Sequence, residues 1–283
     1  MPEVRLRGGE VDGLDLHYVV AGRGPVVVLL HGLGGFAESW RQNLDALAER
    51  ARVFALDLPG FGCSAKPRTH YRLTYFARAL HGFLEAMGIG QASLVGHSLG
   101  AAVGVTYALT HPSRVERLAL LAGVVPGFGY RMSWLYRLLA LRGVGEVLSL
   151  CGRPSVYKAA LARCFASPTR AEIDFLVESH YAARTGLDAR AAYLATVRHV
   201  SADFVEHGEA YRRAVATLDI PVLLIHGRQD PVVASAHCSA VADGLPHASV
   251  RWVDGCGHFP QIENASAVNA WLAEFLVARP APR

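Results

Sequence analysis

The strongest indication of the fold of this chain is the stretch Ala92-Ser93-Leu94-Val95-Gly96-His97-Ser98-Leu99-Gly100. Its last five residues form the pattern G-x-S-x-G, in which a serine stands in a sharp turn between a strand and a helix. Side chains two residues before and two residues after that serine would collide with backbone, so both places need glycine. An apolar run precedes the pattern and small residues follow it at 101–109. The stretch therefore predicts a nucleophilic serine, Ser98, on a strand-turn-helix.

Apolar runs alternate with helical patterns around this stretch. Continuous runs of apolar residues are typical of strands that are buried on both faces of a parallel sheet. Such runs lie at 26–30, 53–56 and 222–225, and apolar runs with polar residues among them lie at 92–95, 115–121 and 249–253. Helical spacing occurs at 39–50, at 73–87 and near the end of the chain. The order predicts an α/β fold with a mostly parallel, doubly wound sheet of about eight strands.

One long interval, residues 123–216, interrupts this alternation. It contains no convincing strand pattern, but it has helix-like stretches at 134–141, 156–165, 170–183 and 189–200, punctuated by glycine and proline. An independent C-terminal helical domain is one interpretation, but the strand pattern resumes at 222–225. We therefore expect a helical cap, 123–216, inserted into a core made of residues 1–122 and 217–283.

Composition excludes several classes of protein. The chain has 283 residues, of which 52% are hydrophobic and 18% charged, and its net charge is +4 without a basic run. These values favour a globular domain over a nucleic-acid-binding one. The five cysteines, Cys63, Cys151, Cys164, Cys238 and Cys256, have no C-x-x-C spacing, so we expect reduced thiols and neither a disulfide framework nor a metal site. The charged start of the chain and the lack of a long apolar run predict a cytoplasmic protein without stable membrane insertion, as a monomer or homodimer.

A serine nucleophile needs a general base and a carboxylate that orients this base. Asp230 lies just past the apolar run 222–225, in a loop, and His258 lies just past the segment 249–253. The carboxyl ends of parallel strands meet at one edge of the sheet, the edge that also carries the turn with Ser98. The sequence therefore predicts that Ser98, Asp230 and His258 act together. Asp254 is a weaker alternative for the carboxylate, because closeness to His258 in sequence does not orient it.

The chain resembles the α/β-hydrolase superfamily, in its serine esterase or lipase-like branch with a helical cap. The resemblance covers nearly the whole length and is carried by the His31-Gly32 loop, the turn Asp57-Leu58-Pro59-Gly60-Phe61-Gly62, the turn with Ser98, and the loops of the acid and the histidine. It implies a triad in the chain order serine, acid, histidine, and it implies an oxyanion hole. The backbone N–H groups of Leu33 and Leu99 would form this hole, and Gly96 and Gly100 would shape the turn. No metal or organic cofactor is implied.

Several other residues receive a structural interpretation. His97 precedes the nucleophile but points away from it in such a turn, so it is expected to pack or to support the site. His31 is expected to shape the oxyanion loop, and Asp57 to be structural. Aromatic residues that could line a substrate pocket are Phe36, Phe128, Trp134 and Phe259, with Tyr136 and Tyr157 as further candidates.

The resemblance leaves more than one reaction open. We expect hydrolysis of small carboxylic esters with short to medium acyl chains or aromatic groups, because it is the simplest reaction of such a triad. A serine at the turn argues against dehalogenases and epoxide hydrolases, which use an aspartate there. Carbon–carbon bond hydrolases of aromatic degradation typically show G-x-G-P-G after the histidine, whereas Leu33-Gly34-Gly35-Phe36 lacks the proline. The remaining alternatives are a lactonase, an acyltransferase, and a receptor that retains the triad but turns over few substrate molecules.

Overall fold

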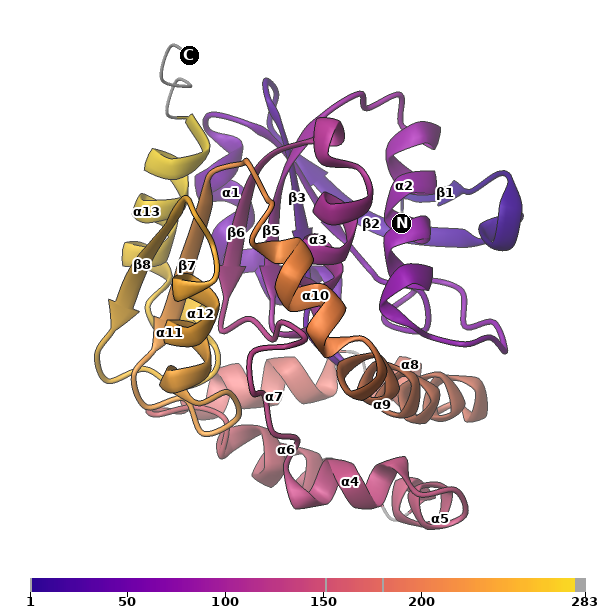
Figure 1. Ribbon diagram of the computed structural model, residues 1–283. Helices are drawn as coiled ribbons and strands as arrows, with labels where there is room; N and C mark the ends of the chain where they lie inside the picture. Colours follow the sequence, from indigo (N-terminus) through magenta and orange to yellow (C-terminus); the bar gives the residue numbers. More distant parts are fainter. Residues whose placement is uncertain (1, 151, 180, 278–283) are drawn as a thin grey trace.

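The computed structural model describes residues 2–150, 152–179 and 181–277 and contains an eight-stranded sheet (Figure 1). Its strands are β1 (Glu3–Arg5), β2 (Asp15–Ala21), β3 (Val26–Leu30), β4 (Arg52–Leu56), β5 (Ala92–His97), β6 (Val115–Leu121), β7 (Val222–Gly227) and β8 (Ala248–Val253). They lie in the order β1-β2-β4-β3-β5-β6-β7-β8. All neighbours from β4 to β8 are parallel, whereas β2 runs antiparallel to both β1 and β4. The predicted α/β fold with a mostly parallel sheet is confirmed.

The six apolar runs of the sequence form the six parallel strands β3 to β8. Strands β1 and β2 had no comparable signal. The side chains of β1 are exposed or half-buried, and only Leu16 and His17 of β2 are fully buried. Strand β1 lies at the edge of the sheet and β2 beside it, and both bury few side chains, so neither sequence needs to form a continuous apolar run.

Helices cover both faces of the sheet, which explains the uninterrupted apolar runs. Val28 and Leu30 of β3 face a cluster that includes helices α2 (Leu73–Ala86), α3 (Leu99–Thr110) and α11 (Ser235–Asp243). Val27 and Leu29 face the opposite cluster, which includes α1 (Arg41–Ala48) and α13 (Ala265–Val277). Successive side chains of a strand point to opposite faces, so a strand that is covered on both faces, such as β3, is apolar throughout. Short helical turns are η1 (Gly9–Val11), η2 (Ala37–Trp40), η3 (Pro112–Arg114) and α12 (Pro260–Glu263).

The chain between β6 and β7 is helical. Its helices are α4 (Trp134–Ala140), α5 (Val144–Leu150), α6 (Pro154–Ala162), α7 (Arg170–Glu178), α8 (Tyr181–Thr185), α9 (Leu187–Glu206) and α10 (Gly208–Val215). Figure 1 shows α4 to α9 as a layer beyond the carboxyl ends of the parallel strands, with α4 and α5 lowest. Helix α10 leads back to the core beside α3, and β7 then pairs with β6. Among the described residues of this segment there is no strand.

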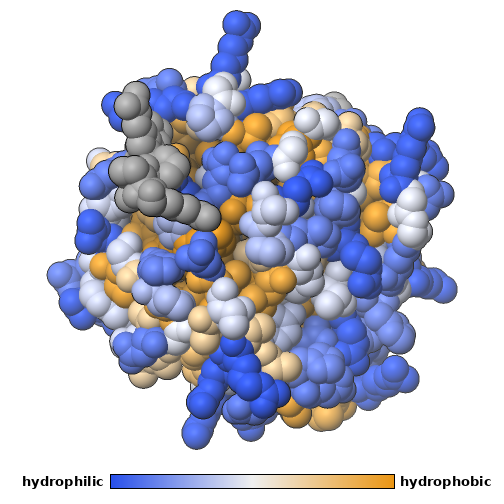
Figure 2. Space-filling view, turned by 45° about the horizontal axis from the view of Figure 1, so that its top comes forward, coloured by the Kyte–Doolittle hydropathy of each residue, from blue (hydrophilic) through white to orange (hydrophobic). Residues whose placement is uncertain are grey.

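The surface and the cysteines add two observations. On the side of the molecule turned to the reader in Figure 2, hydrophilic residues are interspersed with small apolar areas. No helix within the described ranges is both long enough and apolar enough to span a membrane. Cys63, Cys164, Cys238 and Cys256 are free thiols, and Cys151 lies outside the described residues.

Candidate active site

Ser98 stands in the turn between β5 and α3 with a backbone conformation that few residues adopt. Its φ of 51° is positive and its ψ is −114°. The Ser98 N–H donates to the carbonyl of Leu121 at 3.0 Å, and the Ser98 carbonyl accepts from the N–H of Ala101 at 3.1 Å. These bonds to β6 and to the start of α3 hold the strained turn in place. Strain of this kind persists where the surroundings over-determine the backbone, which is common at functional sites.

The glycines on either side of Ser98 are sterically required. A Cβ atom on Gly96 would lie 2.4 Å from the carbonyl oxygen of Gly100, and one on Gly100 would lie 2.1 Å from that of Leu30. Gly32 is also close, because its Cβ would lie 3.1 Å from Cβ of Ser98. The turn, helix α3 and the loop after β3 therefore pack backbone against backbone around Ser98.

Asp230 and His258 meet at the carboxyl ends of β7 and β8. His258 Nδ1 lies 2.9 Å from Oδ2 of Asp230, and Oδ1 of Asp230 accepts the N–H groups of Val232 at 2.8 Å and Val233 at 2.9 Å. A carboxylate acceptor requires the hydrogen on Nδ1, which leaves Nε2 of His258 as a proton acceptor. His258 and Ser98 line the same cavity. The structure thus brings the three predicted residues to one edge of the sheet.

The Asp230 carboxylate is held in its charged form. Its side chain is fully buried, and burial by itself raises the pKa of Asp230. The hydrogen bond and the charge of His258, together with the two backbone N–H donors, outweigh this effect and lower the pKa below the usual value. Asp230 therefore remains an anion that can orient the imidazole and stabilise its protonated form. Asp254 does not compete, because it is exposed and pairs with Arg228 at 2.8 Å.

His97 lines the cavity beside His258 and supports the loop that carries His258. Its Nε2 donates to the carbonyl oxygen of His258 at 2.8 Å, and the two ring centroids are 4.9 Å apart. Burial, followed by the nearby charge of His258, lowers the pKa of His97 to about 3, so its ring is neutral. The expectation that His97 packs behind the site therefore agrees with the geometry.

Glu263 connects the loop that carries His258 to the segment after α6 by hydrogen bonds. No signal in the sequence pointed to this role of Glu263. Its Oε1 accepts the N–H of Gly257 at 3.0 Å and of Phe259 at 3.2 Å, while Oε2 accepts the N–H of Ala166 at 2.8 Å. The N–H of His258 itself donates to the carbonyl of Cys164 at 2.7 Å. A glutamate five residues after a histidine forms no recognisable motif, and its contacts with residue 166 depend on the tertiary fold.

The two residues that are predicted to form an oxyanion hole, Leu33 and Leu99, both lie beside the cavity. Leu99 is the first residue of α3, and the first N–H groups of a helix have no partner within it. Leu33 lies in the loop after β3, and both leucines line the cavity. His31 shapes this loop, because its Nδ1 donates to the carbonyl of Gly32 at 2.7 Å and its Nε2 accepts from the N–H of Leu58 at 3.0 Å. This arrangement agrees with the role expected for His31.

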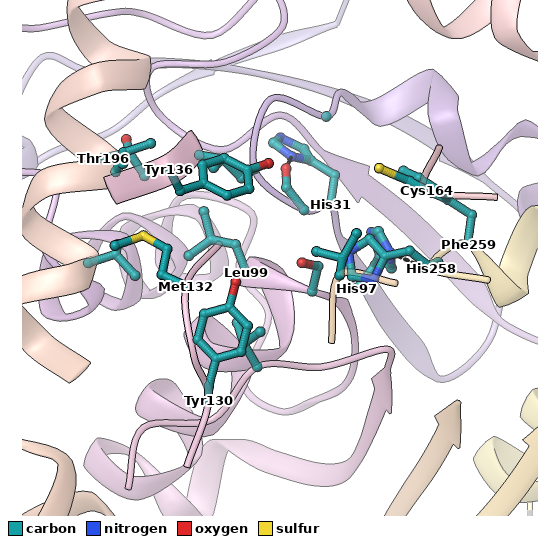
Figure 3. A pocket seen from close by; sticks show the side chains of 18 of the residues that line it. His31, His97, Leu99, Tyr130, Met132, Tyr136, Cys164, Thr196, His258 and Phe259 are labelled. Atoms are coloured by element: carbon teal, nitrogen blue, oxygen red, sulfur yellow. Dashed lines mark hydrogen bonds between the residues drawn. The ribbon is translucent and has the colours of Figure 1, made fainter. Parts of the chain in front are cut away.

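The cavity beside Ser98 has a volume of about 470 Å³ and lies between the sheet and the inserted helices. Figure 3 shows Tyr130, Met132, Tyr136 and Thr196 on one side and His258, Phe259 and Cys164 on the other. Its walls are mainly apolar, and α4, α6, α7 and α9 contribute Tyr136, Leu161, Leu176 and Val197. Burial raises the pKa of the Cys164 thiol to about 11, so this thiol is not a competing nucleophile at neutral pH.

Only part of the predicted aromatic lining belongs to this cavity. Phe36 and Phe259 line it, as does Tyr136. Phe128 is instead buried in the core, where its ring would meet a Cβ on Gly244 at 2.4 Å. Trp134 is 73% exposed, because it projects from α4 to the outside. Tyr157 packs edge to face on Tyr181. Helical spacing in the sequence did not tell which face of α4 is turned inward.

One cluster of metal-ligating side chains occurs within the described ranges: the buried His17 and Asp57, and the exposed Cys63. Both oxygens of Asp57 already accept backbone N–H groups, from Ala37 at 2.6 Å and Cys63 at 2.7 Å. His17 bonds to the carbonyl of Pro2 and to Glu38. The geometry therefore agrees with a structural role for Asp57, which ties the loop after β4 to the loop after β3.

Comparisons with known proteins agree with this architecture. A family model described as alpha/beta hydrolase fold matches residues 25–143 and 175–265. A 2-hydroxy-6-oxononadienedioate/2-hydroxy-6-oxononatrienedioate hydrolase of Burkholderia vietnamiensis is 31% identical over 283 residues, covering 94% of this chain and 92% of that protein. A 2-hydroxy-6-oxo-6-(2'-aminophenyl)hexa-2,4-dienoic acid hydrolase of Metapseudomonas resinovorans is 30% identical over 271 residues, covering 89% and 84%.

A solved structure gives the same result. The 2-hydroxy-6-oxo-6-phenylhexa-2,4-dienoate hydrolase of a Rhodococcus strain is 28% identical and superposes with a TM-score of 0.81, covering 98% of this chain and 99% of that one. The sheet order, the strained turn at Ser98 and the match over most of the length all lead to one assignment. The chain belongs to the alpha/beta hydrolase fold family.

Proposed function

We propose that this protein is a serine hydrolase that cleaves a bond to a carbonyl carbon in a small, largely apolar substrate. The observation that carries the proposal is the His258–Asp230 pair, with Nδ1 and Oδ2 2.9 Å apart, on the cavity that Ser98 also lines. Residues 123–216 act as a cap in this proposal. Its support is that helices of this segment form one wall of the cavity and the loops of the sheet form the other.

The reaction proceeds in two steps. Ser98 Oγ attacks the carbonyl carbon, and His258 Nε2 accepts the hydroxyl proton while Asp230 stabilises the imidazolium. The N–H groups of Leu33 and Leu99 donate to the developing oxyanion. His258 then transfers its proton to the leaving group, which leaves an acyl group on Ser98. A water molecule gives its proton to His258, attacks the acyl carbon and releases the acid.

The proposed mechanism can cleave either a carbon–carbon bond or an ester bond, and a different observation favours each. The names of the two relatives and of the solved structure favour hydrolysis of the carbon–carbon bond next to a ketone, in a 2-hydroxy-6-oxo-dienoate. In that reaction the proton from His258 goes to carbon. The loop Leu33-Gly34-Gly35-Phe36, which lacks a proline, favours the carboxylic ester expected from the sequence. In ester hydrolysis the proton goes to an alkoxide oxygen.

The test is turnover by the wild type, Ser98→Ala, and a matched control, Ser249→Ala, which removes an exposed hydroxyl on β8. Substrates are p-nitrophenyl esters from acetate to palmitate and 2-hydroxy-6-oxo-6-phenylhexa-2,4-dienoate. We expect Ser98→Ala to lower kcat by about 10⁴-fold or more on the active substrate, and Ser249→Ala to leave it unchanged.

The outcomes separate the alternatives. Faster turnover of the dienoate assigns carbon–carbon hydrolysis, and faster turnover of the esters assigns ester hydrolysis. Activity that persists in Ser98→Ala contradicts the serine mechanism. Less than one cycle per molecule on every substrate contradicts the enzyme proposal and supports a receptor.

A further inference from the structure

Large apolar side chains are exposed on one part of the molecule. We call this part the apolar face of α4 and α5, and it includes the first turn of α6. The apolar residues on it are Trp134, Leu135, Leu138, Leu141, Val144, Val147, Leu148, Leu150 and Val156. Elsewhere in the described ranges, only Val20, Leu187 and Val205 are large apolar residues with comparable exposure. Such clustering in a folded domain marks an interaction surface, because isolated exposed apolar residues would be scattered.

The same segment is strongly cationic. Residues 131–163 contain five arginines and one lysine but only one acidic residue, Glu146. Glu146 is paired with Arg198 at 2.8 Å, and Lys158 is paired with Asp174 at 2.6 Å. Arg131, Arg137, Arg142, Arg153 and Arg163 are exposed, and no carboxylate of the described residues forms a salt bridge with them. Arg131 and Arg137 line the cavity beside Ser98, whereas Arg142, Arg153 and Arg163 do not.

Arginines beside exposed tryptophan, leucine and valine indicate which partner fits. Apolar side chains enter the boundary between headgroups and acyl chains, and arginines bind the phosphates of anionic lipids. A second copy of the chain fits less well. A two-fold contact through this face would bring the unpaired arginines of both copies together, since the same patch meets itself.

We propose that the apolar face of α4 and α5 docks on an anionic lipid surface. The docking is peripheral, because the face consists of two seven-residue helices and the start of a third. Helix α4 gives the docking a consequence for the cavity. Its Tyr136 and Arg137 line the cavity, whereas Trp134 and Leu138 on the same helix are exposed. Only helix α4 would thus separate the cavity from the lipid. An apolar substrate would accumulate in that lipid.

The test is co-sedimentation of the full chain with phosphatidylglycerol vesicles and with phosphatidylcholine vesicles. The variants are Arg142→Glu/Arg153→Glu for the charge and Val147→Ser/Leu150→Ser for the apolar contact. Each has a matched control: Arg23→Glu/Arg50→Glu reverses two exposed arginines before β3 and β4, at the opposite end of the strands, and Leu187→Ser alters an exposed residue on α9. None of these residues lines the cavity beside Ser98.

We expect the wild type to bind the anionic vesicles and to lose binding as salt is raised. One arginine near an anionic surface corresponds to about a fivefold change in partitioning, so the Arg142/Arg153 reversal should weaken binding by at least about tenfold. Val147→Ser/Leu150→Ser should also weaken it, whereas both controls should bind like the wild type.

Three results would overturn the proposal: no binding to anionic vesicles at low salt, equal losses in the Arg23/Arg50 control, or a dimer that the Val147/Leu150 variant dissociates. Repeating the binding with Ser98→Ala separates this inference from the proposed function, because docking does not involve the Ser98 hydroxyl.

Discussion

At the scale of single residues, the space around the nucleophile turn explains why the pattern G-x-S-x-G was so informative. Gly96 and Gly100 have no room for a side chain, and their nearest neighbours are backbone atoms that cannot rotate away. Such positions are visible in a sequence because only one residue type fits them.

Gly100 therefore gives a sharp stability prediction. Gly100→Ala would place Cβ 2.1 Å from the carbonyl oxygen of Leu30, so we expect a loss of about 3 kcal/mol or more in unfolding free energy, or no soluble protein. The control is Gly90→Ala, where nothing lies within 4 Å of the new Cβ, and its effect should stay within about 1 kcal/mol. Urea denaturation measures both. Equal effects of the two substitutions would contradict the steric explanation.

Asp57 gives a prediction for pH dependence. Burial raises its pKa to about 6, although the N–H groups of Cys63 and Ala37 act in the other direction. Between pH 4 and 6 the unfolded chain releases this proton more readily than the folded chain, so Asp57 lowers stability as pH rises. In Asp57→Asn this cost is absent. Relative to the wild type, the variant should gain up to about 3 kcal/mol of stability between pH 4 and pH 7.

Urea unfolding of wild type and Asp57→Asn at both pH values checks this expectation. The comparison between the two proteins cancels the contributions of the other titrating groups. A stability difference that stays constant from pH 4 to pH 7 would show that the pKa of Asp57 is close to its ordinary value.

At the scale of elements, the loop that carries His258 depends on contacts outside its own strand. Glu263, at the end of α12, accepts N–H groups from this loop and from residue 166 at once. His258 also donates its N–H to the carbonyl of Cys164. The position of the imidazole is therefore shared between the sheet and the inserted helices.

Removal of Glu263 should loosen this arrangement. Hydrogen bonds to a charged group contribute about 1.5–3 kcal/mol each, so Glu263→Ala should lower the melting temperature and reduce kcat by about tenfold or more. Glu263→Gln keeps one acceptor oxygen, so its melting temperature and kcat should lie between those of the wild type and those of Glu263→Ala. If Glu263 positions His258, kcat will fall in Glu263→Ala while KM changes little. The control is Glu209→Ala, which removes an exposed glutamate on α10. A change in stability with unaltered kcat would assign Glu263 a structural role alone.

At the scale of the whole molecule, buried polar contacts connect α9 to the core. The Asp203 carboxylate accepts from the Arg72 guanidinium at 2.7 Å and from the N–H of Leu73, at the start of α2, at 2.7 Å. On the other side of the sheet, Arg41 pairs with Glu172 of α7 at 2.5 Å. These contacts fix the helices that form the outer wall of the cavity.

Asp203 is the residue of choice for testing this connection. Asp203→Ala removes both acceptors and leaves the buried Leu73 N–H without its partner, so the melting temperature should fall by about 5 °C or more. Asp203→Asn keeps one acceptor oxygen and should lose less. Asp243→Ala, at the end of α11, is the control, and differential scanning fluorimetry is sufficient. A melting temperature unchanged in Asp203→Ala would mean that the contacts of Asp203 do not stabilise the position of α9.

The class of fold, the six parallel strands and the residues that meet beside Ser98 could all be predicted from the amino-acid sequence. These features were predictable because they depend on local rules: a strand buried on both faces must be apolar throughout, and a turn without space must contain glycine. Asp230 and His258 were found because each lies just past a strand, and parallel strands end at the same edge.

Which side chains surround the cavity, and which residues support His258, depends on how the helices pack against the sheet. Phe128 turned into the core and Trp134 turned to the outside, because the direction of a side chain on an inserted helix depends on what packs against that helix. Glu263 emerged as a support for His258 for the same reason, and the partner of His97, the His258 carbonyl, was likewise known only from the structure. Their partners are far apart in sequence, so no local pattern records contacts that exist only after the sheet and the helices have come together.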